Sequence, residues 1–289
     1  MSKFDRAKQA YLARYSSGTR ELYALDLRIF EQWCAQSGIE KPLKVTRADL
    51  ESFSTWLQTT RKNSPRSTHR RLITVRGMFN LALADGLVSR NPFWMLRMPK
   101  WHVDPDRRKW MDRFEVGAIL RAAQNTSPAH HALIALMSMA GLRVSEACNV
   151  RIEDYQGYQD GSRVLHLVGK GGRPATITLP APLLEIMDTA RGDRTQGPLI
   201  TRRNGEAQSR RGAYDWVQRV SSKAGVSGVH PHGFRHAGIT AVLEATGDIY
   251  AAQKFGRHAD IRTTEGYIHR SKKALQGVHV ATHLFASAS

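Results

Sequence analysis

Apolar residues recur every three or four positions along the first third of the chain, which is the spacing of one face of an α-helix. Residues 19–36 carry such a stripe, formed by Leu22, Leu25, Leu27, Ile29, Phe30 and Trp33. Thr46 or Asp49 can begin a second helix that runs through Leu57, and a third covers 64–86. Stripes of this kind on several helices indicate a shared core. The pattern therefore predicts a small all-α domain of about four helices.

Proline residues then mark a linker. Pro92, Pro99 and Pro105 follow the helical segments, and proline cannot continue a helix. A chain of 289 residues is long enough for two domains with separate cores. We therefore place the boundary near residue 105, with a helical domain and linker in 1–105 and a second domain in 106–289.

The second domain combines helices with a hairpin. Helical spacing covers 112–123 and 130–140, and a short helix is expected to begin at Arg143. Alternating β-branched residues flank a glycine-rich turn between 164 and 179, which is typical of a β-hairpin. Everything after Pro180 is predicted to be helical again. The predicted fold class is mainly α, with a small β-hairpin or sheet.

Positive charge is the strongest feature of the composition, with a formal net charge of +18. Residues 1–105 hold 18 Lys and Arg against 9 Asp and Glu, and the remainder holds 25 against 16. An excess in both halves favours a protein that closes on a polyanion, of which nucleic acid is the commonest. The densest cluster consists of Arg61, Lys62, Arg66, Arg70, Arg71 and Arg76. We interpret it as a set of DNA phosphate contacts, with a solvated helix face as the alternative.

Several classes of protein are disfavoured. No apolar run approaches the roughly 20 residues that span a bilayer, and the first residues lack the apolar core of a signal peptide. Cys34 and Cys148 form no CxxC pattern and are expected to be reduced thiols in a cytoplasmic protein. The sequence contains neither an HExxH motif nor a Cys/His pairing, so no metal site is predicted.

Near its C-terminus the chain collects side chains that can break a phosphodiester bond without a metal ion. His232 and Arg235 share one block, and His258 and Tyr267 follow it. A tyrosine hydroxyl can attack phosphorus, arginine forks can hold the non-bridging oxygens, and histidines can donate hydrogen bonds or move protons. Each residue taken alone is more often structural, and His236 is interpreted as a packing residue.

Two upstream blocks complete this set, namely AGLRVSE at 140–146 and GKG at 169–171. Together with HGFRH at 232–236, His258 and Tyr267, they resemble the tyrosine recombinase family of phage integrases and Xer proteins. His258 lies 23 positions after Arg235 and 9 before Tyr267, as in the family pattern. The resemblance covers nearly the whole chain. It implies an N-terminal helical core-binding (SAM-like) bundle and a C-terminal catalytic domain.

The resemblance also implies a role for each matching residue. Tyr267 would be the nucleophile that forms a 3′-phosphotyrosyl link and releases a 5′-hydroxyl. Arg143 and Arg235 would grip the scissile phosphate, since only a guanidinium offers a planar fork for two oxygens. Lys170 would protonate the departing 5′ oxygen. These cations would supply the charge that two-metal nucleases take from ions, so neither a metal, another cofactor nor ATP is expected.

Histidines would complete the site. His232 would act as, or support, the base beside the nucleophile, and His258 would donate a hydrogen bond to the phosphate. Glu146 would orient the region of the first arginine. One position departs from the family, which usually has Leu-Gly-His where this chain has GRH at 256–258. Arg257 takes the place of the usual glycine, and we expect it to add a phosphate contact.

Recombination joins two duplexes, so the resemblance implies a tetramer on double-stranded DNA that passes through a Holliday junction. Accessory DNA-bending or directionality proteins would be further partners, and no membrane is involved. The tail, 271–285, is expected to form a helix that docks on a neighbouring subunit, with docking on its own domain as the alternative. The expected location is the cytoplasm of a bacterial cell or phage-infected host, in association with the nucleoid.

Two alternative functions stay open at this point. A type IB topoisomerase would use the same tyrosine, arginine, lysine and histidine chemistry to relax supercoils as a monomer. A non-cleaving site-specific DNA-binding protein would share the basic surface, although it has no use for a nucleophile. Between recombinases, the sequence favours a phage or mobile-element integrase over a chromosomal Xer-type enzyme.

Overall fold

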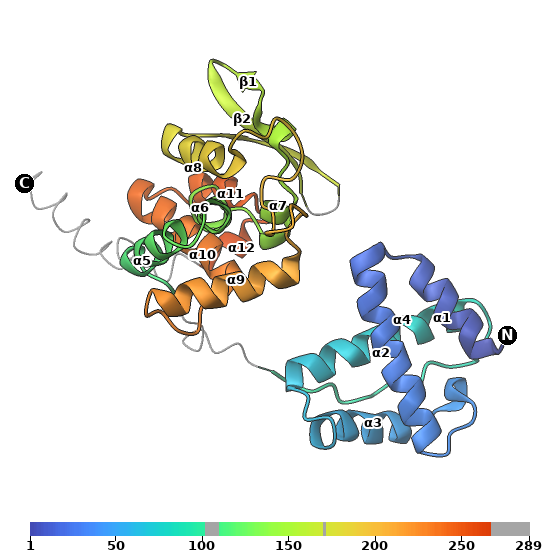
Figure 1. Ribbon diagram of the computed structural model, residues 1–289. Helices are drawn as coiled ribbons and strands as arrows, with labels where there is room; N and C mark the ends of the chain where they lie inside the picture. The colour runs from blue at the N-terminus through green and yellow to red at the C-terminus, as the bar shows by residue number, and fades with distance from the viewer. Residues whose placement is uncertain (102–109, 170–171, 267–289) are drawn as a thin grey trace, which may run out of the picture. The chain divides into compact units, whose positions relative to one another are not determined.

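The computed structural model describes residues 1–101, 110–169 and 172–266. Three features predicted from the sequence lie outside these ranges, namely Lys170, Tyr267 and the tail after residue 270. The chain divides into two compact units, Met1–Pro105 and Asp106–Ser289 (Figure 1). Over the described residues, the first unit is helical and the second combines helices with a small sheet.

The N-terminal unit is a bundle of helices. Its elements are α1 (Lys3–Ala13), α2 (Ser17–Gln36), the short 3-10 helix η1 (Pro42–Lys44), α3 (Arg47–Thr59) and α4 (Pro65–Ala84). The helices predicted over 19–36 and 64–86 are thereby confirmed. The second predicted helix follows Thr46, because the Thr46 hydroxyl accepts from the Asp49 N–H and the Asp49 carboxylate accepts from the Thr46 N–H. This reciprocal capping box satisfies two donors at the helix start.

Aromatic side chains form the centre of the N-terminal core. Phe30 of α2 lies 5.2 to 6.3 Å, between ring centroids, from Phe4 of α1, Trp33 of α2, Phe53 of α3 and Phe79 of α4. All five side chains are buried. The apolar stripes thus meet in one core, to which the stripe of 19–36 contributes Leu27, Ile29, Phe30 and Trp33. The prediction is wrong for Leu22 and Leu25, which are 41% and 44% exposed because they lie on the outer face of α2.

The C-terminal unit contains most of the secondary structure. Its helices are α5 (Arg113–Gln124), α6 (Pro128–Met139), α7 (Val144–Asn149), the 3-10 helix η2 (Ile152–Tyr155), α8 (Ala181–Arg191), α9 (Arg210–Lys223), α10 (Pro231–Thr246), α11 (Ile249–Gly256) and α12 (Arg262–Glu265). Its strands are β1 (Tyr158–Gln159), β2 (Ser162–Val168) and β3 (Pro174–Thr178). They form an antiparallel sheet of order β1-β2-β3, in which Leu165 pairs with Ile177. The predicted hairpin is confirmed by this β2–β3 pair.

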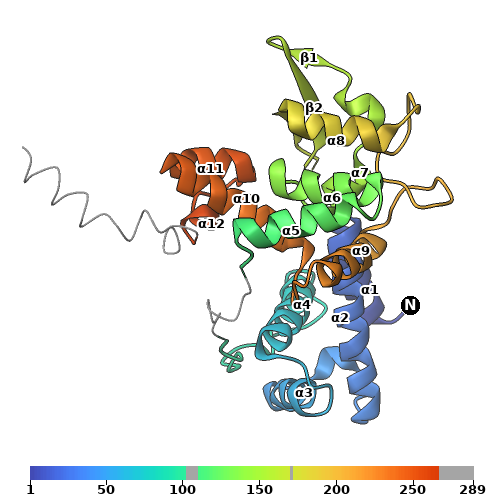
Figure 2. The same ribbon diagram turned by 60° about the vertical axis from the view of Figure 1, so that its left-hand side comes forward.

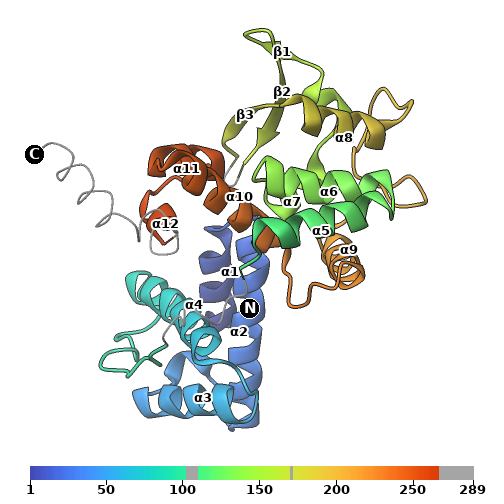
Figure 3. The same cartoon turned by 90° about the vertical axis from the view of Figure 1, so that its left-hand side faces the viewer.

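Helix α6 is the centre of the C-terminal unit. Every side chain from Ala132 to Ser138 is buried, and the helix contacts α5, α8 and α10. In Figures 2 and 3, α8 and the sheet lie on one side of α6, and α5 and α9 lie on the other. A helix that is apolar all round is one that neighbours surround. The position of α6 fixes the turn that follows it, at Ala140–Leu142, inside the unit.

The prediction that everything after Pro180 is helical is wrong for 192–209. Gly192, Gly197 and Gly205 have φ of 59°, 100° and 79°, values that a right-handed helix does not contain. The segment instead forms backbone hydrogen bonds near η2, where the Leu199 N–H donates to the Val150 carbonyl at 2.9 Å.

None of the described helices combines the length and the apolar character that spanning a bilayer requires.

Candidate active site

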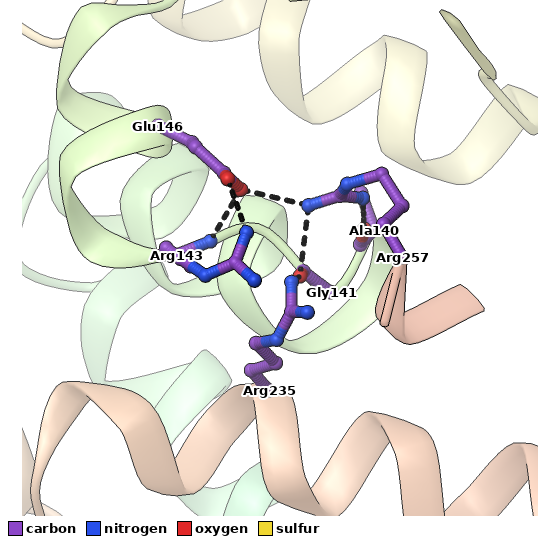
Figure 4. A network of polar contacts seen from close by, with 6 residues as sticks. All are labelled: Ala140, Gly141, Arg143, Glu146, Arg235 and Arg257. Atoms are coloured by element: carbon purple, nitrogen blue, oxygen red, sulfur yellow. Dashed lines mark hydrogen bonds and ion pairs between the residues drawn. The ribbon is translucent and has the colours of Figure 1, made fainter. Parts of the chain in front are cut away.

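The candidate catalytic residues Arg143 and Arg235 meet at the turn between α6 and α7 (Figure 4). Arg143 caps the start of α7, and Arg235 lies in the first turns of α10. His258 follows α11, and the charges of Arg235, Arg143 and His232 all act on its imidazole. The structure therefore brings together four of the six predicted catalytic residues, and the other two, Lys170 and Tyr267, lie outside the described residues.

A buried carboxylate holds Arg143. Glu146, which is 8% exposed, accepts from the Arg143 backbone N–H at 2.9 Å and from its Nη1 at 2.6 Å. Burial opposes ionisation of Glu146, but hydrogen bonds from Arg143 and the charge of Arg257 outweigh it and lower the pKa of Glu146. Glu146 is thus ionised at neutral pH, and it orients the Arg143 side chain.

Arg235 reaches the same turn from α10. Its side chain is 1% exposed, and Nη1 donates to the Gly141 carbonyl. Gly141 has a φ of 61°, and a Cβ placed there would lie 2.8 Å from the Phe255 ring. Glycine is required at this position because both the backbone angle and the close contact exclude a side chain. The closeness of Gly141 to Phe255 emerges only in the fold, because the two residues are far apart in the sequence.

Two further histidines lie on α10. The rings of His232 and His236 are 4.3 Å apart between centroids and are nearly perpendicular. His236 also contacts Trp110, with a centroid distance of 4.9 Å. His236 therefore packs between aromatic rings, which is the role predicted for it, and His232 lies one helical turn before it.

His258 is half-buried, and both its ring and its backbone carbonyl form hydrogen bonds. Its Nδ1 shares a hydrogen bond of 2.9 Å with the Thr264 hydroxyl, and the Gln253 amide donates to its carbonyl at 3.0 Å. Burial, followed by the charges of Arg235 and Arg143, lowers the pKa of His258 to about 4. The imidazole is consequently neutral at pH 7 and has one N–H to donate.

The departure from the family pattern before His258 has a steric reason at Gly256. A Cβ at Gly256 would lie 3.0 Å from Cε1 of His258 and 3.1 Å from Ile239. A leucine at this position would displace the histidine ring in this arrangement. The observed position of the His258 ring therefore depends on a residue without a side chain at 256.

Arg257 turns its guanidinium inward (Figure 4). Nη1 donates to the Ala140 carbonyl at 3.2 Å, and Nη2 donates to the Gly141 carbonyl at 3.2 Å and to Glu146 at 2.7 Å. Burial, partly offset by Glu146, lowers the pKa of Arg257 below its ordinary value. A phosphate contact by Arg257 stays a prediction, and its bonds within the protein were not foreseen from the sequence.

The basic cluster of the N-terminal unit separates into two groups. Arg70 and Arg71 bind Asp26, which is fully buried, and Thr74 donates to the same carboxylate at 3.0 Å. The exposed members of the cluster are Arg61, Lys62, Arg66 and Arg76. DNA contact by the cluster stays a prediction. The sequence contained a clue to Asp26, because it stands within the apolar stripe of 19–36.

The described residues contain no group of three or more His, Cys, Asp or Glu side chains placed to hold a metal ion. Three guanidinium groups, those of Arg143, Arg235 and Arg257, lie around the α6–α7 turn (Figure 4).

Family models match both units. The model described as the phage integrase family matches residues 109–274, which is more than half of the chain. The model described as the phage integrase N-terminal SAM-like domain matches residues 9–86.

Curated relatives match along most of the chain. Tyrosine recombinase XerC of Xylella fastidiosa (strain M23) is 28% identical over 274 residues, which covers 93% of this chain and 91% of that protein. Tyrosine recombinase XerD of Mycobacterium tuberculosis (strain ATCC 25618 / H37Rv) is 28% identical over 293 residues, covering 93% of this chain and 92% of that protein.

Solved structures share the fold. A crystal structure of a lambda integrase(75-356) dimer bound to a COC′ core site is similar with a TM-score of 0.72 and 19% identity, covering 90% of this chain and 95% of that one. The XerH recombinase bound to a palindromic difH substrate is similar with a TM-score of 0.70 and 18% identity, over 91% and 79% of the two chains. The chain therefore belongs to the phage integrase family and is a tyrosine recombinase, an enzyme that breaks and rejoins DNA.

Proposed function

We propose that this enzyme recombines DNA at specific sites through a covalent 3′-phosphotyrosyl intermediate on Tyr267, without a metal ion or ATP. The observation that carries the proposal is the convergence of Arg143 and Arg235 on one turn, with His258 beside them. Two guanidinium groups held in place by the protein form a preorganised site for an anion. Such a site stabilises the charge that develops on a phosphate during attack.

In the proposed reaction, the Tyr267 oxygen attacks the scissile phosphorus, and the bond to the 5′ oxygen breaks. The tyrosine proton passes to a base that His232 provides or supports, and Lys170 gives a proton to the departing 5′ oxygen. Arg143 and Arg235 bind the non-bridging oxygens. Rejoining reverses these steps with a 5′-hydroxyl as the nucleophile, so the energy of the broken bond is kept and ATP is not required.

His258 contributes a hydrogen bond in this scheme. Because its pKa is lowered to about 4, it is neutral at the pH of the reaction. Its Nδ1 is engaged with the Thr264 hydroxyl. In the proposed complex with DNA, Nε2 donates its hydrogen to a phosphate oxygen, and in this tautomer the Thr264 hydroxyl donates to Nδ1.

The two units have separate tasks in the proposal. Residues 1–105 form the core-binding domain and contact DNA phosphates through the exposed cations of the basic cluster, whereas residues 106–289 carry out catalysis. Four subunits on two double-stranded DNA sites would exchange strands through a Holliday junction. A crystal structure of a lambda integrase tetramer bound to a Holliday junction, with a TM-score of 0.72 and 18% identity to this chain, supports the assembly by likeness of fold. Accessory DNA-bending or directionality proteins would act with this assembly.

A trapped cleavage intermediate tests the proposal. Footprinting on DNA flanking the gene would first locate a binding site, because integrases of mobile elements often recombine beside their own gene. A nicked suicide substrate built on that site loses a short 5′-hydroxyl fragment upon cleavage and so prevents rejoining. We expect a denaturation-resistant protein–DNA adduct with the wild type and none with Tyr267→Phe, while both bind the site equally.

Other results would point to the alternatives. Absence of an adduct, despite tight binding to the site, would indicate a non-cleaving DNA-binding protein. Relaxation of supercoiled plasmids without any site preference would indicate topoisomerase activity. A covalent adduct that persists in Tyr267→Phe would show that another residue is the nucleophile.

A further inference from the structure

Arg257 occupies a backbone position that suits glycine. It ends α11 with φ and ψ of 46° and 48°, in the left-handed region that side chains disfavour. Glycine, the usual residue of the family at this place, would adopt the same angles without strain. The side chain at 257 therefore has to provide an interaction that offsets this backbone cost.

The contacts of the Arg257 side chain show what that interaction is. Its guanidinium donates to the carbonyls of Ala140 and Gly141, which end α6, and to the Glu146 carboxylate of α7. Positive charge at a helix C-terminus is favourable, and the planar fork matches several acceptors at once. The side chain is 17% exposed, so these bonds are largely shielded from water. Arg257 thereby ties the end of α11 to the α6–α7 turn.

The Glu146 carboxylate is shared between two arginines. One oxygen accepts from Nη1 of Arg143 at 2.6 Å, and the other accepts from the Arg143 backbone at 2.9 Å and from Arg257 at 2.7 Å. The Gly141 carbonyl is shared in the same way, by Arg257 and Arg235. In Figure 4 the three guanidinium groups surround this one turn. Arg257 therefore contacts the protein groups that hold both candidate phosphate-binding arginines.

We propose that Arg257 is a positioning residue for DNA cleavage, which fixes Arg143 through the shared Glu146 carboxylate and anchors the following residue, His258, to the α6–α7 turn. This inference rests on the proposed function, because it assigns Arg143 and His258 to the scissile phosphate. Because Arg257 orients groups that act at the scissile phosphate and its own guanidinium is bonded within the protein, its effect is on the rate of cleavage rather than on DNA affinity.

Arg257→Gly is a suitable test because it restores an unstrained left-handed residue and removes only the side chain. We expect adduct formation on the suicide substrate, at saturating enzyme, to slow roughly tenfold, as for the loss of hydrogen bonds to a charged group. DNA affinity and its salt dependence should stay unchanged. Arg257→Lys retains the charge without the fork and should remain slower than the wild type. Lys254→Ala, which removes an exposed cation from the same helix, is the matched control and should cleave at the wild-type rate.

A double-mutant cycle with Glu146→Gln tests the route of the effect. If Arg257 acts through Glu146, the rate loss in Arg257→Gly combined with Glu146→Gln will be smaller than the product of the two single losses. A purely structural role predicts instead that the melting temperature falls while the cleavage rate of the folded enzyme is unchanged. That result, or losses that multiply independently, would overturn the proposal.

Two more outcomes distinguish a failure of this inference from a failure of the proposed function. Weaker DNA binding with a shallower salt dependence in Arg257→Gly would identify Arg257 as a direct phosphate contact and overturn a positioning role. An unchanged cleavage rate, in an assay where the wild-type adduct forms and Tyr267→Phe abolishes it, would count against the role of Arg257 alone. If no wild-type adduct forms, both this inference and the proposed function fail.

Discussion

Each unit of this recombinase contains a buried carboxylate bound by two arginines, but the two clusters are built differently. Asp26 forms salt bridges with Arg70 and Arg71, which are neighbours on α4, and accepts a hydrogen bond from Thr74 of the same helix. Glu146 receives Arg143 and Arg257, which are more than a hundred residues apart and belong to different elements. The first cluster joins two helices. The second gathers candidate catalytic segments around one turn.

The surroundings of the two carboxylates explain the difference. The Asp26 side chain is 0% exposed and lies in the helix interface, so its partners stabilise the packing of α2 on α4. The Arg143 side chain is 32% exposed, and its Glu146 partner lies beside the turn that Arg235 also contacts. Exposure of the arginines does not separate the clusters, because the Arg70 side chain is 35% exposed. The difference lies in what each cluster joins: two helices in the first, and the segments of Arg143 and Arg257 at the turn that Arg235 also contacts in the second.

Removing the buried carboxylate of the N-terminal unit should give the largest effect on stability. Asp26→Asn leaves Arg70 and Arg71 without their counter-charge, and breaking a buried pair in this way costs about 3 kcal/mol or more of the free energy of unfolding. Hydrogen exchange over α2 and α4, measured against denaturant, will report this loss. The cleavage rate of the folded enzyme at saturating DNA should be unaffected.

Glu146→Gln provides the contrast for that experiment. We expect a clear loss of cleavage rate in this variant, because the carboxylate that orients Arg143 beside the α6–α7 turn is replaced by a neutral amide. Equal losses of stability in both variants, with no loss of cleavage in Glu146→Gln, would remove the distinction between the two clusters.

Sequence patterns were sufficient for the fold class and for the candidate residues in the described ranges. The helices over 19–36 and 64–86 followed from apolar spacing, and the hairpin followed from alternation around a glycine-rich turn. Arg143, Arg235 and His258 were found by the order of their blocks, and the structure brings them together.

Contacts between side chains that are far apart along the chain could not be predicted from the sequence. Asp26 meets residues 44 to 48 positions away, and Arg257 meets Glu146 at a separation of 111. Periodicity carries no information on such contacts, because they depend on how elements pack in three dimensions. For the same reason, the sequence gives no sign of the bonds that Arg257 makes to Ala140, Gly141 and Glu146.

The basic cluster of 61–76 can be divided by the salt dependence of DNA binding. Arg76→Ala removes an exposed cation of α4 and should reduce the slope of log affinity against log salt concentration by about 0.9, with stability unchanged. Arg71→Ala, on the same helix, should reduce stability and leave the slope unaltered, because Asp26 already holds its guanidinium. Binding measured at several KCl concentrations, together with urea unfolding of each variant, will distinguish them. An identical slope change in both variants would show that the Asp26 partners also contact DNA.

Two histidines of the C-terminal unit give the smallest but most selective comparison. Burial first, and then nearby positive charges, lower the pKa values of both His258 and His130 to about 4. In the unfolded chain a histidine has a pKa of about 6.5, so below that pH the unfolded state binds a proton before the folded state does. The free energy of unfolding therefore decreases as the pH falls from 6.5 toward 4, and replacing either histidine by glutamine should make this decrease shallower.

The rate of DNA cleavage then distinguishes the two histidines, because their pKa values agree but their surroundings differ. His130 stacks on Trp216 with 3.8 Å between ring centroids, so His130→Gln should alter stability and its pH dependence but leave the cleavage rate unchanged. His258→Gln should make the same change and also slow adduct formation at pH 7, because the imidazole N–H beside Arg143 and Arg235 is lost. Adduct formation measured across pH 6 to 8 should show no titration of His258 in the wild type, which is neutral throughout that range. A cleavage rate that changes with a pKa near 6.5 in the wild type, but not in His258→Gln, would show instead that His258 is protonated during the reaction. His258 would then act as a proton donor and not as the neutral hydrogen-bond donor that we infer.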